Sequence, residues 1–215
     1  MAGRITSLEA QRRTKDRVNV YLDDEFAFGL ALDVALPLQI GDWLTDEQIA
    51  ALQLADARVR AREKALNYLA YRPRSAAELR RYLLQRDFSE TVIDAVIERL
   101  REVQLVNDQA FAKFWVDNRA QFRPRGRRAL IQELRGKGIA AELIDAALAD
   151  YDEDAAGWQV AREQARRLRH LPPEVFQRRL RDRLARRGFS YDFIREVLTA
   201  YSPSHTQNES ENLER

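Results

Sequence analysis

The sequence has 215 residues, and an apolar share of 45% with a charged share of 33% fits a soluble protein rich in helices. No run approaches the roughly 18 apolar residues of a membrane helix, and no apolar signal-peptide segment opens the chain, so we expect a cytoplasmic protein. The absence of cysteine excludes disulfides and thiolate metal sites.

Residues 1–55 predict a small module built on a β-hairpin. β-branched and aromatic residues at 18–22 and 26–30 flank the polar segment Asp23-Asp24-Glu25, which is typical of two strands joined by a short turn. Because a lone hairpin is marginal in water, we expect residues 4–8 to add a third strand.

The end of this module carries helix signals. Residues 32–36 predict a short helix that Pro37 stops, and Gly41-Asp42 marks a turn. Thr45 and Gln48 have the spacing of a capping box, in which a hydroxyl and an amide satisfy free N–H groups where a helix begins.

One apolar pattern then occurs three times. The second copy follows the first by 51 residues and the third follows the second by 50, which predicts three copies of one helical unit. We place the repeats at residues 56–106, 107–152 and 153–201, followed by a disordered tail at 202–215. The matched positions are Leu79, Leu83, Phe88, Ile93 and Ile97, then Leu130, Leu134, Ile139, Ile144 and Leu148, then Leu180, Leu184, Phe189, Ile194 and Leu198.

Each repeat is predicted to hold three short helices. In the first, Pro73 keeps Arg72 out of the helical conformation, Ser75 and Glu78 form a second capping box, and Ser89 caps the third helix. In the second repeat, the aromatic residues are expected to lie in the core, since aromatic stripes at helical spacing usually pack. They are Phe111, Phe114, Trp115 and Phe122.

Glycine follows the second helix of the later repeats, in Gly136-Lys137-Gly138 and at Gly188, as expected of a left-handed cap. Pro172 and Pro173 open the second helix of the third repeat. The predicted fold is therefore mainly α: a tandem array of three helix-turn-helix-like repeats behind the hairpin module. Because each unit alone buries little, we expect the units to stack into an elongated array.

No catalytic constellation stands out, and we predict no enzyme activity, no cofactor and no metal site. His205 lies in the predicted tail and His170 at a helix end, where the helix dipole favours it. The eight glycines form no phosphate-binding loop. The acidic run Asp150 to Asp154 lacks calcium-loop spacing and is better explained as a linker that caps a helix.

Positive charge is concentrated locally although the net charge is only +2. From Arg119 to Lys137 seven basic residues face one acidic residue, and eleven arginines lie between Ala155 and Arg195. Such segments are the electrostatic footprint of a polyanionic partner. Only four basic residues are lysine; arginine suits phosphate and carboxylate, but a GC-rich genome gives the same bias.

An Arg-Pro-Arg motif immediately precedes the second helix in each of the first two repeats, and it has two explanations. The proline sets the turn while the arginines cover apolar surface and keep their heads in water. Alternatively, guanidinium groups beside a helix start form a phosphate or carboxylate clamp. The candidate binding residues are Arg72, Arg74, Arg123, Arg125, Arg127, Arg128, Arg135 and Lys137.

In these motifs and their order the sequence resembles the RecX family of recombinase regulators, over residues 3 to 200. The resemblance implies three three-helix repeats and a non-enzymatic protein that binds RecA filaments on DNA and inhibits or tunes the ATPase and strand exchange of RecA. The third repeat has Leu171-Pro172-Pro173-Glu174 in place of the arginine motif. The matching segments are residues 20–28, 65–69, 72–75 with 78–79, 105–108 with 111–112, and 124–126 with Leu130, 133–134 and 137–139.

The main alternative is a sequence-tolerant DNA-binding protein that acts without RecA through its helix-turn-helix-like units. We expect a monomer that touches single-stranded or duplex DNA weakly, through charge, and has no membrane partner. A nuclease or NTPase is disfavoured by the missing ligands and phosphate loop.

Overall fold

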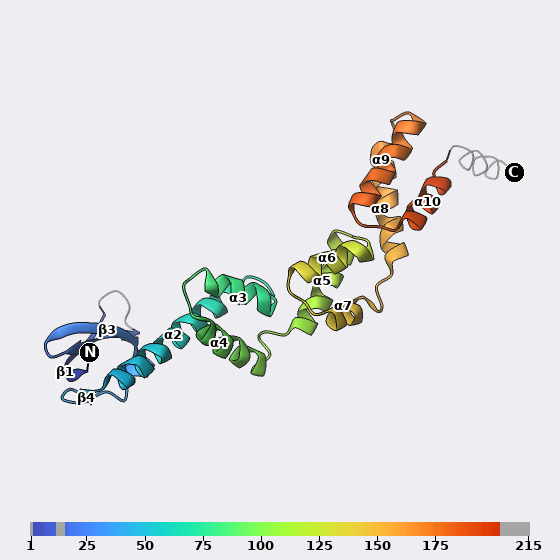
Figure 1. The fold of residues 1–215 in the computed structure, drawn as a ribbon. Helices are drawn as coiled ribbons and strands as arrows, with labels where there is room; N and C mark the ends of the chain where they lie inside the picture. Colours follow the sequence, from blue (N-terminus) through green and yellow to red (C-terminus); the bar gives the residue numbers. More distant parts are fainter. Residues whose placement is uncertain (1, 12–15, 203–215) are drawn as a thin grey trace. The chain divides into compact units, whose positions relative to one another are not determined.

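The structure, a computed structural model, describes residues 2–11 and 16–202. The chain divides into two compact units, Met1–Val106 and Asn107–Arg215. Nearly all of the predicted tail, from residue 203 on, lies outside the described residues. Figure 1 shows the elements in chain order.

The first unit opens with a four-stranded antiparallel sheet in the order β3-β2-β1-β4. The predicted hairpin and third strand are confirmed, but the turn is shorter than predicted: only Asp23 and Asp24 form it, both with positive φ, as in a two-residue hairpin turn. The sequence missed β4, since two residues are too few to show an alternating pattern. The strands are β1 (Gly3–Ala10), β2 (Arg17–Leu22), β3 (Glu25–Ala31) and β4 (Trp43–Leu44).

Two helices follow the sheet. The short helix α1 (Leu32–Ala35) ends before Pro37, as predicted. Helix α2 (Asp46–Leu69) begins at the Thr45–Gln48 capping box, also as predicted. It contains no glycine or proline and runs without a break through the predicted boundary at 55/56. The sheet module and the first repeat therefore share one helix: Ile49 packs in the sheet core, and Ala61 and Ala65 pack in the core of the repeat.

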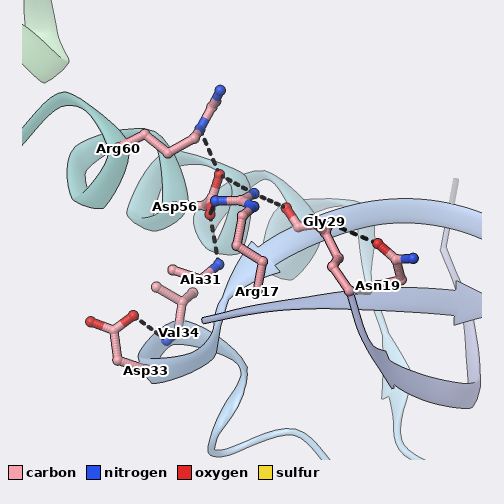
Figure 2. A network of polar contacts seen from close by, with 9 residues as sticks. Arg17, Asn19, Gly29, Ala31, Asp33, Val34, Asp56 and Arg60 are labelled. Atoms are coloured by element: carbon pink, nitrogen blue, oxygen red, sulfur yellow. Dashed lines mark hydrogen bonds and ion pairs between the residues drawn. The ribbon is translucent and has the colours of Figure 1, made fainter. Parts of the chain in front are cut away.

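A buried carboxylate joins the sheet to α2 (Figure 2). Asp56 is 4% exposed, and its Oδ1 accepts a 2.7 Å hydrogen bond from the backbone N–H of Ala31. Arg17 of β2 contacts the same oxygen at 3.0 Å, and Arg60, one turn along α2, lies 2.9 Å from Oδ2. A buried charge is tolerated only when it is paired and hydrogen-bonded in this way. The network therefore holds β2 and β3 against the shared helix.

Replacing Asp56 by alanine leaves the Ala31 N–H without its acceptor and the Arg17 guanidinium with only the Gly29 carbonyl. We expect Asp56→Ala to destabilise the sheet module by about 2–4 kcal/mol, since buried charged hydrogen bonds are costly to break. The measurement is hydrogen exchange of the β2 and β3 amides in the full chain. The control is Asp33→Ala, which removes an exposed carboxylate bonded only locally, to the Val34 N–H, and should change exchange little. Equal effects of the two variants would contradict the prediction.

The first repeat consists of the second half of α2 with α3 (Ala76–Leu84) and α4 (Glu90–Glu102). The predicted caps are confirmed: Ser75 and Glu78 form a complete capping box, and the Ser89 hydroxyl accepts from the Val92 N–H. The predicted core positions of this repeat are buried, except that Phe88 is only partly buried.

The second unit holds the other two repeats, each with its own apolar core. The third repeat begins at Glu153 with Asp152 as its cap, and Pro173 opens α9, as predicted. The predicted core positions are buried in both repeats, except that Leu198 is only partly buried. The helices are α5 (Asp108–Phe122), α6 (Arg127–Gly136), α7 (Ala141–Leu148), α8 (Glu153–Leu168), α9 (Pro173–Arg186) and α10 (Tyr191–Ala200).

The aromatic residues of α5 correct one expectation. Phe111 is buried and Trp115 is partly buried, but Phe114 is 40% exposed and Phe122 is 66% exposed. Phe122 is the last residue of α5, at the end of the helix that leads into the second Arg-Pro-Arg motif. The prediction that all four aromatics lie in the core is therefore wrong for these two.

The second and third repeats meet at two glycines. The backbone N–H of Gly126, the N-cap of α6, donates to the Arg187 carbonyl at 2.9 Å. A Cβ on Gly126 would overlap the carbonyl of Gly188, whose own φ is +83°. The glycine after the second Arg-Pro-Arg motif thus permits a backbone-to-backbone contact that no side chain allows.

We expect Gly126→Ala to destabilise the second unit by about 2–3 kcal/mol, because the added methyl forces the two backbones apart. Gly136→Ala is the matched control: it lies in the last turn of the same helix with open space around it, and should stabilise by about 0.5–1 kcal/mol. Urea unfolding followed by tryptophan fluorescence, in a Trp43→Phe background, reports on Trp115 and Trp158 of this unit alone. Similar midpoints for both variants would show that the glycine contact contributes nothing.

Candidate partner-binding surface

Arg72, the first of the predicted binding residues, contacts groups in its own turn. Arg72 places Nη2 3.0 Å from Glu78 Oε1, and its Nη1 donates to the Pro73 carbonyl at 2.9 Å. Glu78 is also the acidic member of the Ser75 capping box. The guanidinium is therefore already paired with a carboxylate and stabilises the entry to α3, which matches the structural explanation of the motif.

The second arginine belongs to a four-layer stack. Arg74 lies over the Tyr68 ring at 3.9 Å, Tyr68 stacks on Tyr82 at 3.9 Å between ring centroids, and Arg86 lies over Tyr82 at 3.6 Å. Within residues 2–11 and 16–202, no carboxylate pairs with either arginine. Cation–π contacts hold the two guanidinium groups without neutralising them. We call these four residues the repeat-1 stack.

In the second repeat, the four positions that correspond to the repeat-1 stack lie 51 residues later and hold other residue types. They are Arg119, Arg125, Glu133 and Lys137. Glu133 Oε2 accepts from the Arg119 Nε at 2.7 Å and from the indole N–H of Trp115 at 2.8 Å, and Arg125 lies 3.5 Å from Oε1. Arg119 and Lys137 both lie over the Trp115 ring, at 4.5 and 4.2 Å. We call this group, with Trp115, the repeat-2 cluster.

The repeat-1 stack and the repeat-2 cluster have the same net charge. The repeat-1 stack contains two cations and no acid, and the repeat-2 cluster contains three cations around one carboxylate, so each carries a surplus of two positive charges. The equivalent pairs are Arg74 with Arg125 and Arg86 with Lys137. Aromatic rings or a carboxylate hold these heads in fixed positions, which lowers the entropy lost when a partner binds.

Arg127 has a structural role that the sequence did not reveal. Its Nη1 and Nη2 donate to the carbonyls of Leu148 and Tyr151, at 2.9 and 3.1 Å, and its backbone N–H donates to Glu153 at 3.0 Å. It therefore satisfies free carbonyls at the end of α7 and joins α6 to the start of α8.

Tyr151 completes this joint. Its hydroxyl donates to the Arg125 carbonyl at 2.5 Å. Burial raises the pKa of Tyr151 to about 12, so the group keeps its proton and remains a donor at neutral pH.

The other predicted residues are exposed. Arg123, Arg128 and Arg135 have no ion-pair partner in the part of the chain that the structure describes. Arg123 and Arg128 flank the Arg125–Arg127 segment, and Arg135 lies in the last turn of α6. The structure thus separates Arg72 and Arg127, which bind groups of their own chain, from Arg123, Arg128 and Arg135, which are exposed and have no ion-pair partner among the described residues.

Sequence reasoning missed Arg86 and two exposed aromatics. Arg86 occupies the same repeat position as Lys137, so the register that aligned the leucines could have found it. Tyr71 is 86% exposed and Phe122 is 66% exposed, and each immediately precedes an Arg-Pro-Arg motif. Exposed aromatics beside arginine are typical of binding surfaces, since both are enriched among residues that contribute most to binding.

No three His, Asp or Glu side chains gather as a metal site among the residues the structure describes. Within the same residues, no helix is long and apolar enough to cross a membrane.

Four family models match the chain in sequence order. They are the N-terminal domain of regulatory protein RecX at residues 3–41 and the first, second and third three-helix domains of RecX at residues 61–100, 107–148 and 152–198. Each three-helix match falls on one of the repeats described above.

Relatives and a solved structure agree over nearly the whole chain. The regulatory protein RecX of Bacillus pumilus is 31% identical over 97% of this chain and 82% of its own length. That of Bacillus subtilis is 31% identical over 88% of this chain and 74% of its own length. A crystal structure of regulatory protein RecX superposes with a TM-score of 0.70 at 31% identity, covering 92% of this chain and 98% of that one. The chain therefore belongs to the RecX family of regulatory proteins, which are not enzymes.

Proposed function

We propose that the protein binds RecA–DNA filaments and inhibits the ATPase and recombinase activities of RecA, which makes it a cytoplasmic regulator of DNA repair, recombination and the SOS response. The observation that carries the proposal is the pair of cationic groups at one register position in two successive repeats. Family membership supplies the regulatory role.

A repeated cationic surface suits a repeated anionic partner. A protein filament on DNA presents the same acidic side chains and phosphates at every subunit, and complementary charge speeds encounter and suppresses wrong partners. The repeat-1 stack and the repeat-2 cluster each contain two more cations than carboxylates, and Arg123, Arg128 and Arg135 add exposed charge in the second unit. Such a protein acts by occupying surface, as a monomer, without a reactive centre.

A second candidate is direct DNA binding without RecA. Exposed arginines at Arg123, Arg128 and Arg135 favour it, because phosphate neutralisation needs no shaped pocket. Binding of this kind weakens steeply as salt rises, since counterions are released from the nucleic acid. A salt titration with and without RecA separates the two functions.

The repeat cations provide a direct test. We expect the double variant Arg86→Gln/Lys137→Gln to need about tenfold more protein for half-maximal inhibition of RecA, because it removes one equivalent charge from each repeat. The measurement is ATP hydrolysis by RecA on single-stranded DNA over a range of protein concentrations and salt.

The matched control is Arg99→Gln/Arg101→Gln, which removes two exposed arginines that already pair with glutamates on α4. It loses the same formal charge and should inhibit like the wild type. Equal weakening by both doubles would show that net charge, rather than the repeat position, determines binding. No effect of the wild-type protein on RecA would overturn the proposed function.

Variants of the neighbouring residues Arg127 and Arg128 should differ in stability. Arg127→Gln removes both carbonyl contacts and should destabilise the second unit by about 2–3 kcal/mol. Arg128→Gln changes an exposed residue and should stay within about 0.5 kcal/mol of the wild type. Thermal unfolding by circular dichroism measures both. A stable Arg127→Gln protein would mean that its contacts to α7 contribute little.

A further inference from the structure

Three adjoining depressions lie along α9 in the third repeat. The first, about 460 Å³, is lined by residues of α6, α9 and α10, including Arg128, Arg186 and Tyr191. The second, about 410 Å³, shares Tyr191 and Arg181 with the first. The third, about 490 Å³, adjoins the second at Gln177. We call this continuous surface the α9 track.

The α9 track is strongly and uniformly basic. Seven arginines line its three depressions, and no aspartate or glutamate among the described residues lines any of them. Arg128 and Arg186 are exposed and have no ion-pair partner within residues 2–11 and 16–202. Arg181 contacts only its exposed neighbour Asp182, at 3.3 Å. A lining of this kind attracts anionic groups and favours a bound polyanion.

Aromatic side chains line the same depressions as the arginines. Tyr191, the first residue of α10, is 75% exposed at the junction of the first two depressions. In the third depression, Phe176 and Tyr201 approach to 6.2 Å between ring centroids. Proteins that hold single strands combine a basic groove with aromatic rings on which bases stack. A duplex keeps its base faces within its own stack, so an exposed tyrosine in the groove favours a single strand.

We propose that the α9 track binds single-stranded DNA, with phosphates on Arg181 and Arg186 and a base on Tyr191. The proposal rests on the proposed function, because the partner of that function carries DNA. It gives a nucleic-acid contact to the one repeat that lacks the Arg-Pro-Arg motif. Helix α9 spans about 21 Å, so the track holds a few nucleotides.

The test is fluorescence anisotropy of a labelled dT15 oligonucleotide with the full-length protein, without RecA, across salt concentrations. We expect Arg181→Ala/Arg186→Ala to bind about tenfold more weakly at low salt. Its slope of log affinity against log salt should fall by about 1.4, for two lost phosphate contacts. Tyr191→Ala should bind about 5- to 100-fold more weakly with an unchanged slope, and Tyr191→Phe should bind normally.

Helix α9 supplies its own control. Arg178 and Arg179 are exposed on the same helix but line none of the three depressions, so Arg178→Ala/Arg179→Ala should stay within twofold of the wild type. Circular dichroism checks that every variant is folded. Equal losses in both doubles, or no binding of dT15 by the wild type, would overturn the site.

Parallel RecA ATPase assays distinguish this inference from the proposed function. If Arg181→Ala/Arg186→Ala binds dT15 normally but no longer inhibits RecA, the track contacts protein instead, and the DNA site is wrong. If the wild type binds dT15 through the track yet leaves RecA activity unchanged, the site stands and the proposed function falls.

Discussion

A single left-handed residue after the second helix determines the geometry of every repeat. Asp87, Gly138 and Gly188 occupy the same position and have φ values of 61°, 75° and 83°. This conformation ends one helix and turns the chain so that the next apolar residue, Phe88, Ile139 or Phe189, packs back on the repeat. Glycine adopts it without strain, and aspartate is among the few other residues that tolerate it.

The residue that precedes the left-handed residue makes different contacts in different repeats. In the first two repeats it is Arg86 or Lys137, whose charged group lies over an aromatic ring. In the third repeat it is Arg187, whose guanidinium contacts the Pro124 carbonyl at 3.4 Å and whose pKa is lowered by burial against the second repeat. The same backbone geometry thus places a cation over an aromatic ring in two repeats and joins neighbouring repeats in the third.

The structural explanation of the Arg-Pro-Arg motifs holds for Arg72, and the binding explanation stays a prediction for the other arginines. Arg72 and Arg127 bind groups of their own chain, while Arg74 and Arg125 lie in the cationic groups. Charges that act at the rim of an interface mainly affect association rate and salt dependence.

Much of this architecture could be predicted from the sequence, because the signals are local. The 50- and 51-residue spacing of leucines, the Ser75 and Thr45 capping boxes and the Asp23-Asp24 turn each depend on residues close in the chain, so the repeats, helix starts and hairpin were predictable. Only the tertiary structure decided what each arginine contacts. Arg127 meets carbonyls 21 and 24 residues away, and Gly126 meets a backbone more than 60 residues away, so no local pattern encodes either contact. Whether an arginine stabilises a turn or remains available to a partner depends on which acceptors packing brings within reach, and packing is a property of the folded chain.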